Sequence, residues 1–301
     1  ARAEFQRPRD PEAALRAARK ASETSALDFA WPLAHSAGRL NHLEEALEAF
    51  GRWDKADGEF LEGFVHWEYF FEYARTLHQM GNHEKELEVL RAGMRWASSQ
   101  DIGLEELRRL ELFALVALGR TEEADSLEGE LPRFSDWAYM EYPAQLEFFG
   151  HSDRAQMFLE GEVERFQTEP YYQENPRARA GVMSALGRYQ EALAILEPLL
   201  AEAPVAESRS LLSQMGLTAA RMGDTARAHE IAQRLAEHPD EQRAPWQRVF
   251  IAGALGEKDQ ALSFMRRVPP TQAGWFMWRY GSDFRSLQGY PPFEEFMRPE
   301  G

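Results

Sequence analysis

The sequence predicts an all-α protein, a right-handed solenoid of stacked helical hairpins that ends in a capping element. A short turn pattern recurs at nearly regular intervals along most of the 301 residues. Apolar residues beside each turn follow helical spacing, for example at Ala192, Ile195, Leu196 and Leu199. Runs of alternating β-branched residues, which would indicate strands, do not occur in the sequence.

The recurring turn is a glycine that is followed, five residues later, by a position that usually holds alanine. The hexamers are GRWDKA from Gly51, GNHEKE from Gly81, GRTEEA from Gly119, GHSDRA from Gly150, GRYQEA from Gly187, GDTARA from Gly223 and GEKDQA from Gly256. Successive glycines are 30, 38, 31, 37, 36 and 33 residues apart, a mean of about 34. A period of this size is typical of stacked two-helix repeats.

The residues of each hexamer have a physical role in a helical hairpin. Glycine can end the first helix because it adopts the left-handed conformation without a Cβ clash. An alanine such as Ala192 lies one turn into the second helix, where a small side chain lets the two helices approach closely. Pro204 is expected to end that second helix.

The chain divides into three expected parts. Residues 1–37 form an N-terminal partial repeat or cap, residues 38–268 form about seven hairpins, and residues 269–301 form a C-terminal cap that covers the last apolar face. The first helix has a clear start, since Asp10 is a good N-cap, Pro11 suits the first helical position and Glu12 favours the positive helix end.

Composition excludes several classes of function. The chain has 34 basic and 50 acidic residues, a formal charge of −16, so we expect it to bind neither nucleic acid nor an anionic membrane surface. The dispersed acidic residues favour a role in solubility, and a preference for basic partners stays open as the alternative. The absence of cysteine excludes disulfides, thiolate catalysis and cysteine-based zinc sites. No apolar stretch reaches 18 residues, so no membrane insertion is expected.

Motifs of enzymes and metal sites are not found. His78 and His83 flank the turn at Gly81, with Glu84 beside them, but their spacing of five crosses a turn and a zinc pair on a helix needs a spacing of four and a third ligand. We therefore expect polar turn residues there. The sequence contains no nucleophile motif and no glycine-rich phosphate loop. It predicts no catalytic residue, no cofactor, no metal and no enzyme activity.

The repeats resemble the tetratricopeptide repeat (TPR) family over nearly the whole chain. In RARAGVMSALGRYQEALAILEPLLAEAP, the residues Gly187, Tyr189, Ala192 and Pro204 match the turn glycine, the following aromatic residue, the second-helix alanine and the terminal proline of the family. Gly216 matches the family's first-helix glycine. Other repeats depart from the pattern, since Glu86 stands where alanine is expected after Gly81.

The ending SDFRSLQGYPPFEEFM resembles the ends of such arrays in bacterial multidomain signalling proteins, where the repeats follow a kinase, cyclase or winged-helix domain. This resemblance implies a regulatory or scaffolding segment of a longer protein. The charged start ARAEFQRPRD, which has no initiator methionine and no apolar core of a signal peptide, agrees with it. The cytoplasm is the favoured compartment, and an extracytoplasmic location remains open for a parent chain with a transmembrane segment.

The resemblance also implies which side chains line the binding surface. In the family, the first helices of the hairpins form a concave face that binds extended peptides, with arginines for carboxylates and rings as anchors. Counting back from each turn places these residues there: Arg75, His78, Arg109, Trp137, Met140, Arg177, Arg221, Arg243, Trp246 and Phe250. The alternative is that they are packed or solvated, with arginines neutralised by acidic neighbours such as Glu174 and Glu207.

The expected partner is therefore a protein or peptide. Three alternatives stay open: a sensor that encloses a small molecule on its concave face, an enzyme with an unrecognised site, and a homodimer that forms through the solenoid ends or aromatic patches.

Overall fold

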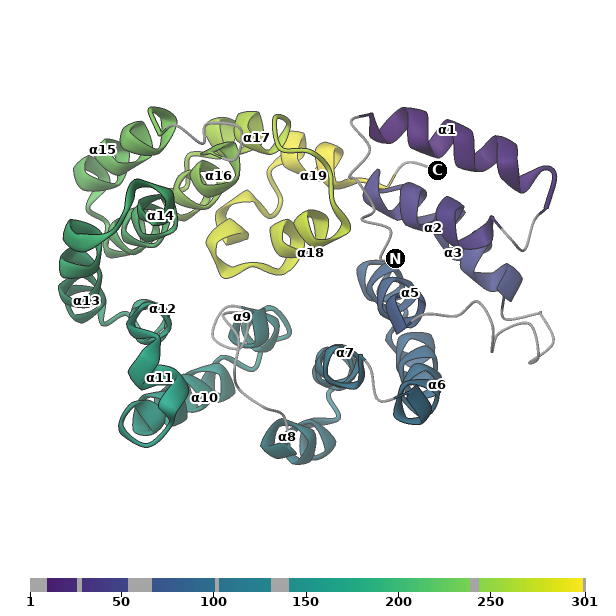
Figure 1. The fold of residues 1–301 in the computed structure, drawn as a ribbon, viewed down its shortest axis with the longest axis horizontal. Helices are drawn as coiled ribbons and strands as arrows, with labels where there is room; N and C mark the ends of the chain where they lie inside the picture. Colours follow the sequence, from purple (N-terminus) through teal and green to yellow (C-terminus); the bar gives the residue numbers. More distant parts are fainter. Residues whose placement is uncertain are drawn as a thin grey trace. The chain divides into compact units, whose positions relative to one another are not determined.

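The computed structural model describes residues 10–25, 29–53, 67–100, 103–130, 141–238 and 244–299. No strand occurs among these residues, so the prediction of an all-α protein is confirmed for them (Figure 1). The helices are α1 (Pro11–Ser22), α2 (Ala30–Arg39), α3 (Leu43–Trp53), α5 (Trp67–Gln79), α6 (His83–Gln100), α7 (Leu104–Ala117), α8 (Thr121–Glu130), α9 (Glu141–Phe148), α10 (Ser152–Glu164), η1 (Arg165–Gln167), α11 (Pro170–Glu174), α12 (Pro176–Ala185), α13 (Tyr189–Glu202), α14 (Val205–Met222), α15 (Thr225–Ala236), α16 (Ala244–Ala254), α17 (Lys258–Met265), α18 (Gln272–Tyr280), η3 (Ser282–Leu287) and α19 (Pro291–Met297).

Two predicted helix boundaries, at Asp10 and at Pro204, are confirmed. Asp10 caps α1, because its Oδ1 accepts the backbone N–H of Ala13 at 2.9 Å, and Pro11 is the first helical residue. Pro204 separates α13 from α14 and is the N-cap residue of α14. Tyr171 and Tyr172 lie in the short helix α11 between α10 and α12.

Glycines in the left-handed conformation join the two helices within each of six hairpins. Gly81, Gly119, Gly150, Gly187, Gly223 and Gly256 have φ angles between 69° and 86°. At the Gly187 turn the N–H of Arg188 donates to the carbonyl of Met183 at 2.9 Å. This bond satisfies a carbonyl that would otherwise have no hydrogen-bond partner at the helix end. The helices on either side of each turn pack against each other, as α12 does with α13 and α14 with α15.

The first hairpin differs from the prediction. Gly51 is not a turn residue but lies inside α3, and the left-handed residue of this hairpin is Asn41, with φ 65°. Asparagine tolerates this conformation better than most residues that carry a Cβ, so the glycine pattern does not include this turn. This hairpin consists of α2 and α3, and α2 begins at Ala30.

Small residues at the hairpin corners are buried, as the turn pattern predicts. The position five residues after each left-handed residue is at most 1% exposed in six hairpins, at Ala46, Ala124, Ala155, Ala192, Ala228 and Ala261. The same position of the α5–α6 hairpin is Glu86, which is also completely buried. The buried carboxyl group of Glu86 therefore needs hydrogen-bonding or charged partners, which the alanines at the other corners do not need.

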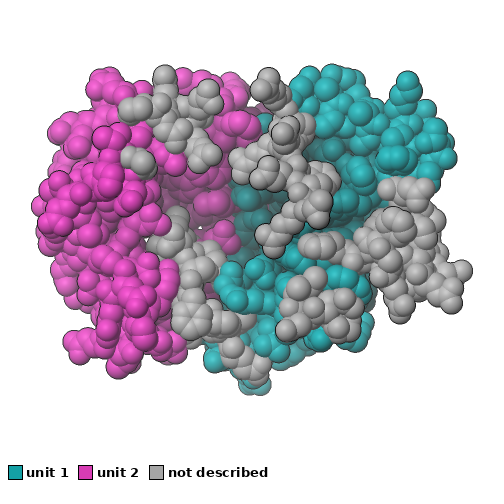
Figure 2. All heavy atoms as spheres, in the orientation of Figure 1, with its two compact units in different colours: residues 1–132, 270–276, 297–301 teal, residues 133–269, 277–296 magenta. Residues whose placement is uncertain are grey.

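The chain forms two compact units (Figure 2). The first comprises residues 1–132, 270–276 and 297–301, and the second comprises residues 133–269 and 277–296, so the division falls within α18. In the first unit the ring of Phe50 stacks on Tyr73 at 4.8 Å in the core between α2, α3 and α5. In the second unit the core joins α12 to α16 through residues such as Leu196 and Ile231.

The C-terminal segment, residues 269–299, contacts more helices than those of the last hairpin. In the second unit η3 packs against both α16 and α9, and Phe284 at its centre is completely buried. Gly253 of α16 makes room for it, because a Cβ there would lie 2.7 Å from the Phe284 ring. In the first unit the start of α18 lies on α5, where Gln272 Nε2 donates to Thr76 Oγ1 at 2.8 Å.

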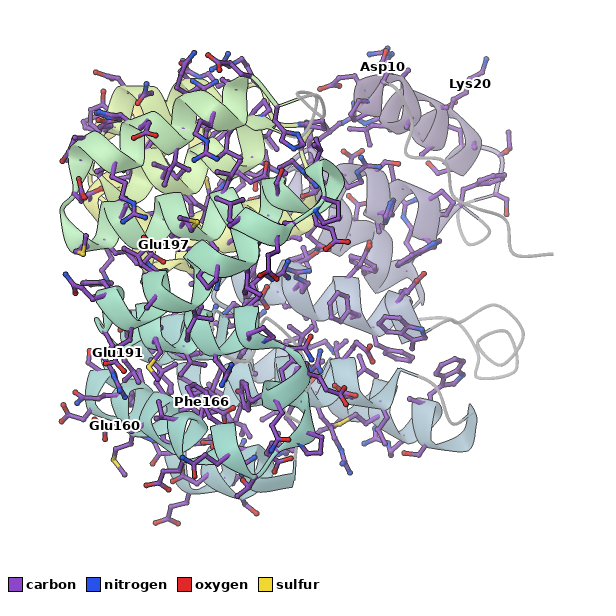
Figure 3. All side chains as sticks on the ribbon, turned by 60° about the vertical axis from the view of Figure 1, so that its left-hand side comes forward. Asp10, Lys20, Glu160, Phe166, Glu191 and Glu197 are labelled. Atoms are coloured by element: carbon purple, nitrogen blue, oxygen red, sulfur yellow. The ribbon has the colours of Figure 1, made fainter. Side chains whose placement is uncertain are left out.

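Acidic side chains gather on solvent-facing sides of the second helices of the hairpins. Glu160 on α10 and Glu191 and Glu197 on α13 are exposed (Figure 3). This placement agrees with the interpretation that the negative charge supports solubility. None of the helices in the described part of the chain is long and apolar enough to cross a membrane.

Candidate functional site

A groove in the second unit brings four of the predicted residues together. It has a volume of about 230 Å³ and is bordered by α12, α14, α16 and Met277 of α18. We call it the inner groove. Its lining residues are Arg177, Gly181, Ser184, Ser210, Ser213, Gln214, Leu217, Thr218, Arg221, Trp246, Gln247, Phe250 and Met277. The first helices of three consecutive hairpins, α12, α14 and α16, thus all contribute side chains to it.

Arg177 lies at the start of α12, where neighbouring residues of α14 hold it. Its Nη1 donates to Ser210 Oγ at 3.0 Å. The backbone carbonyl of Arg177 accepts a hydrogen bond from Gln214 Nε2 at 2.9 Å. Both bonds join equivalent faces of two consecutive hairpins, so the guanidinium is positioned along the border of the inner groove.

Arg221 binds a carboxylate of its own chain. Its Nε and Nη2 donate to the two carboxylate oxygens of Asp283 in η3, at 2.8 and 2.9 Å. Burial acts to lower the pKa of Arg221, but the charge and hydrogen bonds of Asp283 outweigh it and raise the pKa above the ordinary value. The neutralising residue is therefore Asp283 and not one of the expected neighbours, Glu174 and Glu207.

Two rings form the other side of the inner groove. Trp246 and Phe250 lie one turn apart on α16, with ring centres 5.8 Å apart. Phe250 is 8% exposed, and its ring centre lies 5.2 Å from that of Phe284. Trp246 is partly exposed, so it offers the more accessible apolar surface.

The other predicted residues do not extend this groove. His78 does not line an open surface as expected, since it is completely buried. Arg109 forms an ion pair with Glu105 on its own helix. Arg75 lines a different pocket, described next. Trp137, Met140 and Arg243 lie outside the described residues.

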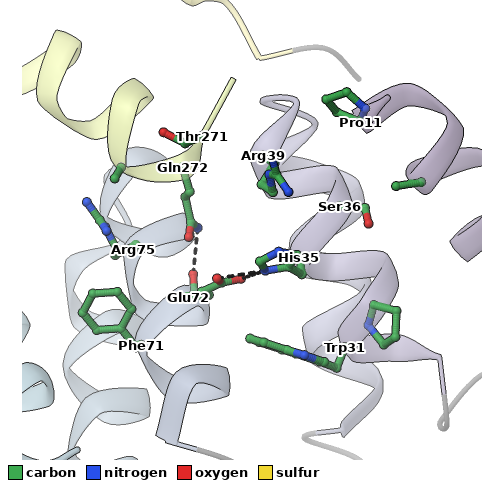
Figure 4. A pocket seen from close by; sticks show the side chains of 13 residues that line it. Pro11, Trp31, His35, Ser36, Arg39, Phe71, Glu72, Arg75, Thr271 and Gln272 are labelled. Carbon is green, nitrogen blue, oxygen red and sulfur yellow. Dashed lines mark hydrogen bonds and ion pairs between the residues drawn. The ribbon is translucent and has the colours of Figure 1, made fainter. Parts of the chain in front are cut away.

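The first unit holds a pocket of about 540 Å³ (Figure 4). We call it the α2–α5 pocket. Trp31 and Phe71 supply rings to its wall, and Arg39 and Arg75 supply positive charge. Across it, His35 Nδ1 lies 2.8 Å from Glu72 Oε2. The remaining lining residues are Pro11, Ala14, Pro32, Ser36, Thr271, Gln272 and Ala273.

A cluster of two histidines and one glutamate is the only group in the described residues whose donor atoms suit a metal ion. It consists of His78 at the end of α5 and His83 and Glu86 at the start of α6, with their ligand atoms within 4.8 Å of one another. Burial raises the pKa of Glu86 to about 8, although the hydrogen bond and charge of His83 act to lower it.

No protein-family model matches the chain, and no curated protein is significantly similar. The resemblance to tetratricopeptide repeats therefore rests on the sequence pattern, and the site is interpreted from its own geometry.

Sequence reasoning missed three residues that determine these sites. Asp283 is 62 positions from Arg221 in the sequence, and nothing in the repeat pattern indicates their contact. Gln272 likewise lies far in sequence from Thr76. Glu86 could have been found, because a glutamate at a position that elsewhere holds a buried alanine implies a partner, and His78 and His83 are the nearest candidates along the chain.

Proposed function

We propose that the chain is an interaction module, a solenoid of the tetratricopeptide type, that binds an extended segment of another protein in the inner groove. The observation that supports this is the convergence of Arg177, Arg221 and Trp246 from three consecutive hairpins in one groove. Equivalent positions of stacked repeats form a continuous track, and a peptide in extended conformation has the matching shape.

The chemistry of the groove defines the expected ligand. The charge of Arg177, whose Nη1 donates to Ser210 on the border of the groove, favours a ligand carboxylate beside it, whereas the Arg221 guanidinium already holds Asp283. Trp246, Leu217 and Met277 offer an apolar surface for one side chain beside it. A volume of about 230 Å³ is smaller than the usual small-molecule pocket of about 300–1,000 Å³, so it accommodates a few side chains rather than a whole cofactor.

The overall charge adds a second requirement. With a net charge of −16, the protein attracts basic partners over long distances. We therefore expect a segment that has one acidic anchor and an adjacent apolar residue, flanked by lysine or arginine.

Selection from a displayed library of random dodecapeptides against the full chain tests this function. The expected result is enrichment of the acidic–apolar pattern with basic flanks. For selected peptides, Arg177→Ala and Trp246→Ala should each weaken binding at least about tenfold, the usual effect of removing an anchoring residue. Arg234→Ala, on the exposed side of α15, is the control and should bind as the wild type does. Selected peptides that bind both groove variants with unchanged affinity would show that the groove is not the binding surface.

A small-molecule sensor is the second candidate, and the α2–α5 pocket favours it. Its volume of about 540 Å³ lies within the usual range for small ligands. Rings beside two arginines suit a planar molecule that carries a carboxylate.

Calorimetric titration with 2-naphthoate, which has both features, tests the sensor function. Binding is expected in the wild type and should weaken about tenfold or more in Trp31→Ala and Arg75→Ala, since each removes one of the two recognised features. Arg16→Ala is the control, since Arg16 is exposed on α1 outside the pocket. No heat of binding in the wild type, or binding that both variants retain, would remove the support for this candidate.

A further inference from the structure

Glu86 occupies a position where a charge is costly. It is completely buried at the corner of the α5–α6 hairpin, the position that holds alanine in the other hairpins described above. A buried carboxylate destabilises a fold by several kcal/mol unless hydrogen bonds, a proton or a cation compensate it. The replacement of alanine by glutamate at this corner therefore calls for a specific explanation.

Two histidines surround this carboxylate. His78 Nδ1 lies 3.0 Å from both oxygens of Glu86, and His83 Nδ1 lies 2.9 Å from Oε2. His78 comes from the last turn of α5, and His83 and Glu86 come from the first turn of α6, so the Gly81 turn brings the three together. The two imidazole rings are 4.7 Å apart.

We propose that His78, His83 and Glu86 form a binding site for a divalent transition-metal ion. Two imidazole nitrogens and one carboxylate are a ligand set that zinc and neighbouring metals accept, with one position left for water. Magnesium and calcium prefer oxygen ligands and are not expected to bind.

The distances fit an ion after a small adjustment. Zinc lies about 2.0–2.2 Å from such ligands, which places the ligand atoms of a tetrahedral ion about 3.3 Å apart. In the cluster the nitrogen–oxygen distances are 2.9 to 3.0 Å, and all ligand atoms lie within 4.8 Å of one another. A small rotation of the His83 ring, which is 13% exposed, would bring the set to the required spacing.

The surroundings support selective binding. His78 and Glu86 are fully buried, and Phe276 covers His78 with its ring centre 5.2 Å away. Such an environment strengthens the interaction between the ion and its ligands. His83 is the only partly exposed member of the cluster and gives the ion a path from solvent.

Zinc titration of the chelator-treated full chain, in competition with a chromophoric chelator, tests the proposal. We expect one equivalent of zinc to bind and the melting temperature to rise with zinc concentration. Magnesium at the same concentration should produce no shift. Glu86→Ala, which introduces the residue found at the other corners, and His83→Ala should each weaken zinc binding at least tenfold.

The matched control is His229→Ala. His229 also pairs with a glutamate, Glu257, at 2.5 Å, but that pair is more exposed, and no third metal-ligating side chain joins it among the residues that the structure describes. This variant should bind zinc like the wild type. Absence of zinc binding by the wild-type chain would overturn the proposal and leave the cluster as a hydrogen-bonded network. If Glu86→Ala and His83→Ala both bound zinc as tightly as the wild type does, the proposal would be overturned as well, because the ion would then bind elsewhere.

Discussion

Replacement of Phe284 by alanine is expected to lower the free energy of unfolding by about 3–5 kcal/mol, the usual cost of removing a buried phenylalanine. The ring is completely buried, lies beside Phe250 and fits over Gly253, so little can move in to fill its space. The loss should also loosen η3, because the Phe284 ring packs against Phe250 and Gly253 of α16. Urea denaturation gives the free energy, and amide hydrogen exchange of residues 282–287 reports the loosening.

Met157→Ala is the control for this prediction. Met157 is a large apolar side chain of the same unit, but it is 70% exposed, so its removal should change stability by less than about 0.5 kcal/mol. If Phe284→Ala were no more destabilising than Met157→Ala, η3 would not be held by this ring, and our account of the C-terminal segment would be wrong.

The helical fold could be predicted because its signals are local. A left-handed residue, a small residue five positions later and an apolar face all lie within a few turns of each other, as at Gly187 and Ala192. The failure at Gly51 has an equally local reason. Asn41 adopts the same conformation as the turn glycines, and Gly51 is an ordinary helical residue. The residue type alone therefore does not reveal which of the two makes the turn.

The candidate site could be predicted only in part. The resemblance to the tetratricopeptide repeat family implied that Arg177, Arg221 and Trp246 share one surface, and the inner groove contains all three. Asp283, the partner of Arg221, could not be predicted, because the path of the C-terminal segment depends on tertiary packing. The fit of Phe284 over Gly253 determines where Asp283 lies, and no periodicity encodes that fit.

The contact between Arg221 and Asp283 is expected to contribute strongly to the stability of the second unit. The side chain of Asp283 is 8% exposed and that of Arg221 is 21% exposed, so the pair lies between a surface ion pair and a fully buried one. Arg221→Met or Asp283→Leu alone should each destabilise by about 2–3 kcal/mol, because either change leaves one charge in a mostly buried position.

The double variant Arg221→Met/Asp283→Leu distinguishes a lost interaction from a general loss of packing. Since it leaves no unpaired charge, it should recover more than half of the sum of the two single losses in a double-mutant cycle. The same cycle on Arg188 and Glu191, an exposed pair within one turn of the chain, is the control and should show weaker coupling. Strictly additive losses at Arg221 and Asp283 would mean that the two charges do not stabilise each other. In that case Arg221 would be available to a ligand carboxylate, and the assignment of the acidic anchor to Arg177 alone would have to be revised.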